Sequence, residues 1–190
     1  MSSFDVAGFR EELESCRSPL YLFHDDPDGL ASFLMLKKVK DGVGVPIKSK
    51  PIITVQFANK VVEVEADKVF VLDVAMMEEE FVDEVKDPIV WLDHHEPVKM
   101  AGSLKKVKYF NPQLKGKNIP TPALCYEAFP EQLQSNGLWL AGLGSFAEWF
   151  VPEFLDEFKK DFPELLPSKW KTPGDVIYNS KLGKLIELFS

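Results

Sequence analysis

The chain has 190 residues, of which 45% are hydrophobic, and a formal net charge of −8. This length fits one domain, and this hydrophobic content is enough for a packed core, which excludes a disordered or fibrous chain. The acidic balance excludes a nucleic-acid binder that works by bulk positive charge alone, while it leaves room for a local basic track.

Neither a membrane segment nor a disulfide framework is expected. No apolar run approaches the roughly 20 residues of a transmembrane helix, and the charged, amphipathic N-terminus has no signal-peptide core. The two cysteines, Cys16 and Cys125, stand singly and far apart, so they form no metal-binding CxxC pair. They indicate two buried thiols in a reducing, cytoplasmic protein.

The first part of the chain alternates between helical and strand patterns. Apolar residues recur at helical spacing and predict helices over 4–16, 30–40 and 77–87. The second of these helices is ended by the Gly- and Pro-containing segment 41–46. Apolar runs predict strands over 19–24, 52–57, 68–75, 88–95 and 106–112.

These predicted strands indicate the fold class. Several are continuous runs of β-branched and aromatic residues, which are typical of parallel strands buried on both faces of a sheet. Strands that alternate with helices predict an α/β fold, with a parallel, doubly wound sheet of about five strands flanked by helices. Beyond Pro112 the patterns are helical only, so we expect a helical C-terminal part.

Acidic and histidine side chains follow three of the predicted strands. All 3 histidines of the chain belong to these clusters, which comprise His24 with Asp26, then Asp73, then Asp93, His94 and His95. The carboxyl ends of parallel strands meet at one edge of the sheet, where open α/β sheets bind ligands. A single carboxylate after a strand can merely cap the next helix. Several carboxylates that converge repel one another unless a cation compensates them, and together with imidazole they suit Mn, Fe, Zn or Mg.

Four motifs resemble those of the DHH phosphoesterase superfamily. HDDPDGLAS, which starts at His24, is similar to the first signature, His-x-Asp-x-Asp-Gly, and VLDVA around Asp73 resembles the second. WLDHHEP contains the Asp-His-His triplet that names the superfamily, and YFNPQ resembles its archaeal and RecJ-like members. The resemblance covers about residues 18–150, and the order and spacing of the motifs make it specific.

The resemblance implies a phosphoesterase with two Mn²⁺ ions, or Mg²⁺ in their place. One ion would be held by His24, Asp26 and Asp73, and the other by Asp28, Asp73, His94 and Glu148, with Asp73 between the two. Glu148 stands where the family usually has Asp, and the alternative for it is an ordinary carboxylate on a helix surface. Asp93 and His95 would be the catalytic residues, since Asp93 would orient the histidines and His95 would face the substrate phosphate. A hydroxide activated by the two metals would attack phosphorus in line.

The resemblance also divides the chain. Residues 1–150 are expected to form the DHH phosphoesterase domain, and 151–190 a helical extension or linker of it. The second, substrate-binding domain of the family has no counterpart in this sequence, so we expect a protein partner or a missing domain to complete the cleft. Lys105, Lys106 and Lys108 are candidates for contacts to substrate phosphates, unless they are only solvating surface lysines.

The expected activity is hydrolysis of phosphodiester bonds in single-stranded or short nucleic acid, as by a RecJ-like exonuclease or an oligonucleotide phosphodiesterase. Two alternatives are a phosphatase of small nucleotides or polyphosphate, and a catalytically weak or inactive scaffold subunit of a replication or repair assembly. The intact set of acidic residues argues against a scaffold, because clustered carboxylates are costly to keep. A metal-free nucleotide-binding module is disfavoured, because the sequence has neither a GxGxxG nor a Walker loop.

Overall fold

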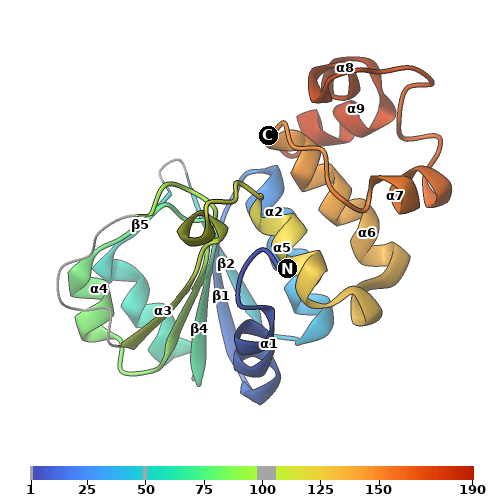
Figure 1. The fold of residues 1–190 in the computed structure, drawn as a ribbon. Helices are drawn as coiled ribbons and strands as arrows, with labels where there is room; N and C mark the ends of the chain where they lie inside the picture. Colours follow the sequence, from blue (N-terminus) through green and yellow to red (C-terminus); the bar gives the residue numbers. More distant parts are fainter. Residues whose placement is uncertain (1, 49–50, 98–105) are drawn as a thin grey trace.

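A computed structural model describes residues 2–48, 51–97 and 106–190. A parallel sheet of five strands in the order β2-β1-β4-β6-β7 forms its centre (Figure 1). The strands are β1 (Pro19–His24), β2 (Val43–Ile47), β4 (Lys68–Leu72), β6 (Ile89–Leu92) and β7 (Val107–Phe110). The prediction of an α/β fold with a five-stranded parallel sheet is therefore confirmed.

Helices cover both faces of this sheet because the strands alternate apolar side chains between the two faces. Tyr21 and Phe70 point into one core and Leu22 and Val71 into the other. The first core is covered by α1 (Val6–Ser15), α2 (Pro27–Val39) and α5 (Thr121–Ala128), and the second by α3 (Ala58–Glu63) and α4 (Glu79–Glu84). The two layers of helices, with the sheet between them, are visible in Figure 1.

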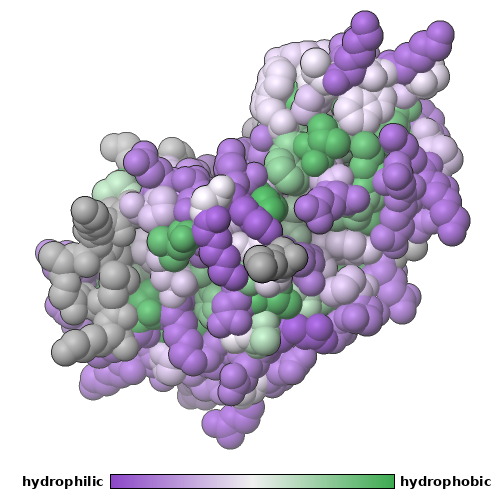
Figure 2. All heavy atoms as spheres, viewed as in Figure 1, coloured by the Kyte–Doolittle hydropathy of each residue, from purple (hydrophilic) through white to green (hydrophobic). Residues whose placement is uncertain are grey.

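The C-terminal helices extend the first of these cores. They are α6 (Pro130–Ala147), α7 (Leu155–Asp161), α8 (Pro173–Asn179) and α9 (Lys181–Leu188). α6 packs against α2 and α5, and buried residues of the last three helices, such as Phe158, Val176 and Leu182, belong to the same cluster as Tyr21. On the face seen in Figure 2, hydrophobic residues gather over these C-terminal helices. Residues 151–190 thus share the core of the sheet domain.

One strand of the predicted sheet is wrong. The second strand was predicted over 52–57, but the structure has β3 (Ile52–Ile53) there, followed by the 3-10 helix η1 (Val55–Phe57). β3 pairs with β5 (Met76–Met77) in a separate two-stranded sheet. The missing strand is β2, from the segment that the sequence marked only as a helix breaker. β2 lies at the edge of the sheet, where Pro46 and Gly44 are tolerated because one side of the strand needs no ladder partner.

Two further sequence predictions concern the environment of the chain. Cys16 and Cys125 are buried free thiols, as predicted. Burial, together with the neighbouring carboxylate of Asp67, raises the pKa of the Cys16 thiol to about 12, so this thiol is unreactive at neutral pH. Among the described residues, no helix combines the length and the apolar character that a membrane span requires.

Candidate metal centre

The carboxyl ends of four strands lie in register. Phe23 on β1 pairs with Leu72 on β4, which pairs with Leu92 on β6, which in turn pairs with Phe110 on β7. The residues that follow these four are His24, Asp73, Asp93 and Asn111. The N–H groups of Asp73 and Asp93 continue the ladder, donating at 3.0 Å to the carbonyl oxygens of Leu92 and Phe110. The register of the sheet therefore sets residues far apart in the sequence side by side at one edge.

Asp26 lies between the first strand and α2, and it is the N-cap of this helix. Its backbone is extended (φ −83°, ψ 175°), as expected before Pro27. One oxygen of its carboxylate accepts a hydrogen bond from the N–H of Gly29 at 3.1 Å and caps α2, and the other contacts Nδ1 of His24. The helix begins three residues earlier than predicted, so Asp28 lies in its first turn and is buried. A side chain at Gly29 would collide with the carbonyl oxygen of His24 at 2.3 Å, so only glycine permits this close turn.

Asp73 is buried in a strained conformation. It follows β4 with a left-handed φ of +57°, and only 1% of its surface is exposed. Its Oδ1 accepts a hydrogen bond from the hydroxyl of Thr121 at 3.0 Å, whereas its buried Oδ2 has no hydrogen-bond partner among the described residues. A buried carboxylate oxygen without a donor is costly unless a cation satisfies it.

His94 lies among three carboxylates. Its Nε2 is 3.2 Å from Oδ1 of Asp73, 3.6 Å from Oδ2 of Asp28 and 3.8 Å from Oε2 of Glu148. Glu148 caps the C-terminal end of α6, the helix that packs on α2, and its side chain is 38% exposed. The end of α6 thus brings a residue from the C-terminal part of the chain to the sheet edge.

The histidines and acids form three overlapping groups that could hold cations. Within each group, one ligand atom per residue lies within 4.8 Å of the others; the groups are His24–Asp26–Asp73, Asp28–His94–Glu148 and Asp73–His94–His95. The first two contain the residues that the sequence predicted as ligands, and the third, which adds His95 as a ligand, was not predicted. Carboxylate oxygens with imidazole nitrogens fit a divalent ion such as Mn²⁺ or Mg²⁺.

The protonation equilibria of the site favour added positive charge. Burial, and then the charge of neighbouring acids, raises the pKa values of Asp28 and Glu148, and burial raises that of Asp73. Burial alone would lower the pKa of His94, but its hydrogen bonds and charge attraction to Asp28 and Asp73 raise it to about 11. The acids are thus easier to protonate than usual and the histidine is harder to deprotonate, because the cluster has an excess of buried negative charge.

Asp93 holds the ring of His95. Its Oδ1 lies 2.7 Å from Nδ1 of His95, and its Oδ2 accepts a hydrogen bond from the backbone N–H of His95 at 3.2 Å. Asp93 is fully buried, and its hydrogen bond is the main cause that raises the pKa of His95. The sequence predicted that Asp93 orients both histidines; among the described contacts it bonds the ring of His95 and not that of His94.

Three supporting residues were not predicted. The side-chain amide of Asn111 donates to the carbonyl oxygen of His95 at 2.9 Å, and that of Gln113 donates to the carbonyl oxygen of His94 at 2.6 Å. Thr121 bonds Asp73. Asn111 and Gln113 could have been found, because they follow the fifth strand at the same sheet edge. Thr121 opens a helix 10 residues after Asn111, and nothing in its local sequence signals this contact.

Comparisons with known proteins show the same architecture. No protein-family model and no curated protein matches the chain. Three solved structures, each covering 97% of this chain, are similar: RecJ from Thermus thermophilus in complex with Mn²⁺ (TM-score 0.59, 16% identity), exonuclease RecJ bound to manganese (0.60, 14%), and the DHH domain of a member of the s1p family of ribosomal proteins (0.65, 13%). The chain has a RecJ-like DHH-domain fold. It spans 34%, 60% and 49% of those three chains, respectively.

Of the predicted substrate lysines, those described lie at the opposite end of the DHH fold. Lys108 forms an ion pair with Glu12, which also bonds the ammonium group of Lys68 at 2.7 Å. Lys68 opens β4, and Lys106 directly precedes β7, so both lie at the amino ends of strands. Because the metal cluster lies at the carboxyl ends, Lys106 and Lys108 are not brought to it. Lys105 lies outside the described residues.

The two neighbouring acids of the first DHH motif are expected to differ in their effect on metal binding. Asp26→Asn should lower Mn²⁺ affinity by more than about 100-fold. Removing a direct ligand reduces metal affinity more than removing a residue that only holds a ligand in place, which typically costs about 10- to 100-fold. Asn still caps a helix, so the fold should survive. Asp25→Asn should change the affinity less than about threefold, because Asp25 is 39% exposed and its oxygen lies 4.0 Å from Nε2 of His24. Titration calorimetry with Mn²⁺ measures both, and equal losses would contradict the assignment.

Proposed function

We propose that the chain is a metal-dependent phosphohydrolase that cleaves phosphodiester bonds in single-stranded or short nucleic acid with two Mn²⁺ ions. The observation that carries this proposal is the buried cluster in which Asp73 belongs to two ligand groups while its Oδ2 lacks a hydrogen-bond partner among the described residues. A carboxylate that belongs to two such groups is well placed to bridge two cations.

Each residue of the cluster has a role in this proposal. His24 and Asp26 would hold one ion, and Asp28, His94 and Glu148 the other, with Asp73 shared. Bound cations would supply an activated water molecule and would offset the negative charge that develops on the phosphate. Asp93 would accept a hydrogen bond from Nδ1–H of His95 and stabilise the doubly protonated ring, whose Nε2–H can donate a hydrogen bond to a phosphate oxygen. No covalent nucleophile is needed.

The substrate class is supported by the fold. Two of the similar structures are of RecJ, one named as an exonuclease, and both are described with manganese. Because identity to them is 16% or less, they support the substrate class by analogy only. The intact cluster argues against a scaffold without catalysis, because a chain that binds no metal has no use for four buried or half-buried carboxylates at one sheet edge.

The test is release of mononucleotides from end-labelled short single-stranded oligonucleotides with and without Mn²⁺. We expect hydrolysis by the wild type that depends on Mn²⁺, and a loss of at least about 100-fold for His94→Gln, because His94 belongs to two of the three groups. A wild type that binds no Mn²⁺ would support the scaffold alternative. Hydrolysis of polyphosphate but not of oligonucleotides would contradict the substrate class alone.

Metal affinity should rise with pH. The pKa of His94 without metal is raised to about 11, so the ring is protonated at neutral pH and must lose its proton before Nε2 can bind a cation. Metal binding therefore releases a proton, and the affinity should increase roughly tenfold per pH unit between pH 6 and 8. Calorimetry in buffers of different ionisation enthalpy counts the released protons. An affinity that does not change with pH would show that His94 is not a ligand.

A further inference from the structure

Two exposed aromatic rings lie beyond the end of α6, the helix that Glu148 caps. Trp149 follows the candidate ligand Glu148 and is 58% exposed, and Tyr178 on α8 is 75% exposed. Their rings meet edge to face, with centroids 6.2 Å apart. Gly174 leaves the space for the indole, because a side chain there would lie 2.9 Å from it. Since both rings keep more than half of their surface in water, packing of the core does not account for them.

The backbone of Trp149 is strained. α6 ends in a Schellman turn, in which the N–H of Phe150 donates to the carbonyl of Ser145 at 2.9 Å and that of Trp149 to the carbonyl of Phe146 at 3.0 Å. This turn requires a left-handed residue, and Trp149 has φ +54°. Glycine is the usual residue at such a position, and a bulky residue costs stability. Strained residues of this kind gather at functional sites, which points to a contact made by the ring.

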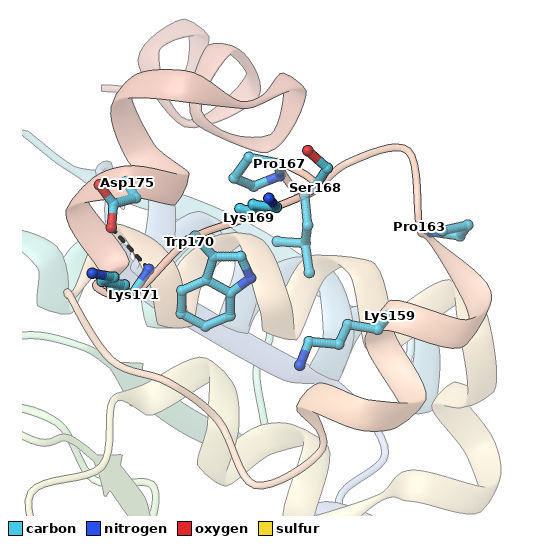
Figure 3. A pocket seen from close by; sticks show the side chains of 9 residues that line it. Lys159, Pro163, Pro167, Ser168, Lys169, Trp170, Lys171 and Asp175 are labelled. Carbon is cyan, nitrogen blue, oxygen red and sulfur yellow. Dashed lines mark hydrogen bonds between the residues drawn. The ribbon is translucent and has the colours of Figure 1, made fainter.

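A basic pocket adjoins the aromatic pair. The pocket has a volume of about 630 Å³ and is lined by three lysines, Lys159, Lys169 and Lys171, around Trp170 (Figure 3). The residue after Gly174, Asp175, also lines it, so the pocket and the indole of Trp149 meet at the first turn of α8. The exposed aromatic pair and the pocket therefore flank the same turn of the chain, at Gly174 and Asp175.

The charges of this pocket favour an anion. Among the described residues, the side chains of Lys169 and Lys171 form no hydrogen bond, while the charge of Lys171 attracts the carboxylate of Asp175. The Asp175 carboxylate accepts hydrogen bonds from the backbone N–H groups of Lys171 and Thr172 at 2.9 Å, which hold it at the first turn of α8. Lys159 extends over the ring of Trp170, with Nζ 5.7 Å from its centroid (Figure 3). Lys159 also lies 3.8 Å from the exposed carboxylate of Asp156. A chain with a net charge of −8 thus places three lysines around one aromatic ring, where they outnumber the single acid that lines the pocket.

We propose that this surface binds the strand of a single-stranded nucleic acid outside the cleavage site. A base would stack on Trp149 and Tyr178, and the next phosphates would lie at Lys169 and Lys171. Aromatic platforms combined with a basic groove are the usual means of binding single strands without sequence preference. Polyphosphate could contact the lysines, but it has no base that could stack on the aromatic rings. The proposal takes its substrate class from the proposed function, but binding requires no metal.

The test measures binding of a dye-labelled oligothymidylate of about 12 nucleotides to the full chain in EDTA, by fluorescence anisotropy at low salt. Lys169→Glu with Lys171→Glu should weaken binding by more than about tenfold. The matched control is Lys38→Glu with Lys86→Glu, which makes the same charge change at two exposed lysines on other surfaces. This control should weaken binding less than about threefold, because it acts only through the net charge.

Trp149→Gly separates stacking from folding. Glycine suits the left-handed position, so the melting temperature should stay unchanged or rise, while oligonucleotide binding should weaken about tenfold. Trp149→Phe should keep most of the binding. Tyr178→Ala, at an exposed position, should weaken binding several-fold without unfolding the chain.

Several outcomes would contradict the proposal that this surface binds single strands. These are a wild type that does not bind the oligonucleotide in EDTA, a charge-reversed pocket that binds no worse than the control, or ring variants that bind as the wild type does. Polyphosphate that competes as well as the oligonucleotide would do the same. Binding in EDTA without any Mn²⁺-dependent hydrolysis would contradict the proposed function but not the proposal that this surface binds single strands.

Discussion

Replacing Asp73 by asparagine is expected to make the metal-free protein more stable and at the same time to abolish its response to Mn²⁺. Asp73 is buried, has one oxygen without a hydrogen-bond donor among the described residues, and lies near other acids of the cluster. Removing its charge relieves repulsion and desolvation. Asparagine also adopts the left-handed conformation at φ +57° more readily than most residues. We expect a gain of about 1–2 kcal/mol, or a melting temperature about 2–6 °C higher.

The effect should reverse when metal is added. Saturating Mn²⁺ at about 100 times its Kd stabilises a wild-type site by about 2.7 kcal/mol, whereas the variant lacks the carboxylate shared by the two groups. If Asp73 bridges two ions as proposed, hydrolysis of oligonucleotides should fall at least about 10³-fold, because each ion would lose a ligand. Thermal melts of both proteins measure this reversal: the variant should melt at the higher temperature without Mn²⁺, and the wild type with it. Asp25→Asn is the control, because it makes the same substitution at an exposed position.

The pH dependence identifies the cause of the gain. Burial raises the pKa of Asp73 in the folded state, so its protonated form is favoured there. At low pH the wild type carries this neutral form and should resemble the asparagine variant. As the pH rises through the folded-state pKa, the wild type must ionise a buried group, and the difference in melting temperature should grow. A variant that is less stable than the metal-free wild type at pH 8 would show instead that the ion pair with His94 dominates.

The sequence predicted the central strands of the sheet correctly but missed the edge strand β2. β4 and β6 are continuous apolar runs that can only be buried on both faces, so their place in a parallel sheet followed from composition. β2 contains Gly44 and Pro46, which argue against a central strand, and only its position at the sheet edge explains them. Residues 52–57 are as apolar as a strand but form a short bridge and a turn of helix. Local patterns carry no information about which apolar run reaches the edge.

Some residues of the candidate site were also predictable from the sequence, and others were not. The convergence of His24, Asp73 and Asp93 was predictable, because parallel strands end at one edge. The position of Glu148 depended on a motif resemblance, since nothing in the sequence of α6 says that its last turn lies beside His94. The strain at Trp149 was not predictable at all, because the helix pattern around it is continuous and the left-handed turn exists only in the folded chain. Features set by the packing of α6 on α2 are those that the sequence did not provide.

Asp93→Asn is expected to lower hydrolysis by about 10²–10⁴-fold while leaving most of the Mn²⁺ affinity in place. Asp93 belongs to none of the three candidate metal groups, and its oxygens bond the ring and backbone N–H of His95. In the variant, a neutral amide replaces the carboxylate that stabilises the positively charged ring, so the ring loses a proton more readily. With Nδ1–H bonded to the amide oxygen, Nε2 then offers a lone pair to the substrate in place of an N–H donor. The loss should therefore appear in kcat rather than in metal binding.

The pH profile of this variant distinguishes an effect on His95 from damage to the fold. The hydrogen bond to Asp93 is the main cause that raises the pKa of His95, so in Asp93→Asn the pKa falls. Activity that needs the protonated ring is lost as the pH rises through this pKa, and in the variant it is lost at lower pH. The ratio of wild-type to variant activity should thus be larger at pH 8 than at pH 6.

A double-mutant cycle tests whether Asp93 acts through His95. If Asp93 acts through His95, then Asp93→Asn in a His95→Gln background should cost less than about threefold further activity, because the ring that it orients is already gone. Additive losses would mean that Asp93 acts elsewhere, through Tyr109 or Asn111, whose side chains lie 3.4 and 3.5 Å from its Oδ2. In that case the carboxylate supports the end of β7 and not the protonated ring of His95, and the pH profiles of wild type and variant should coincide.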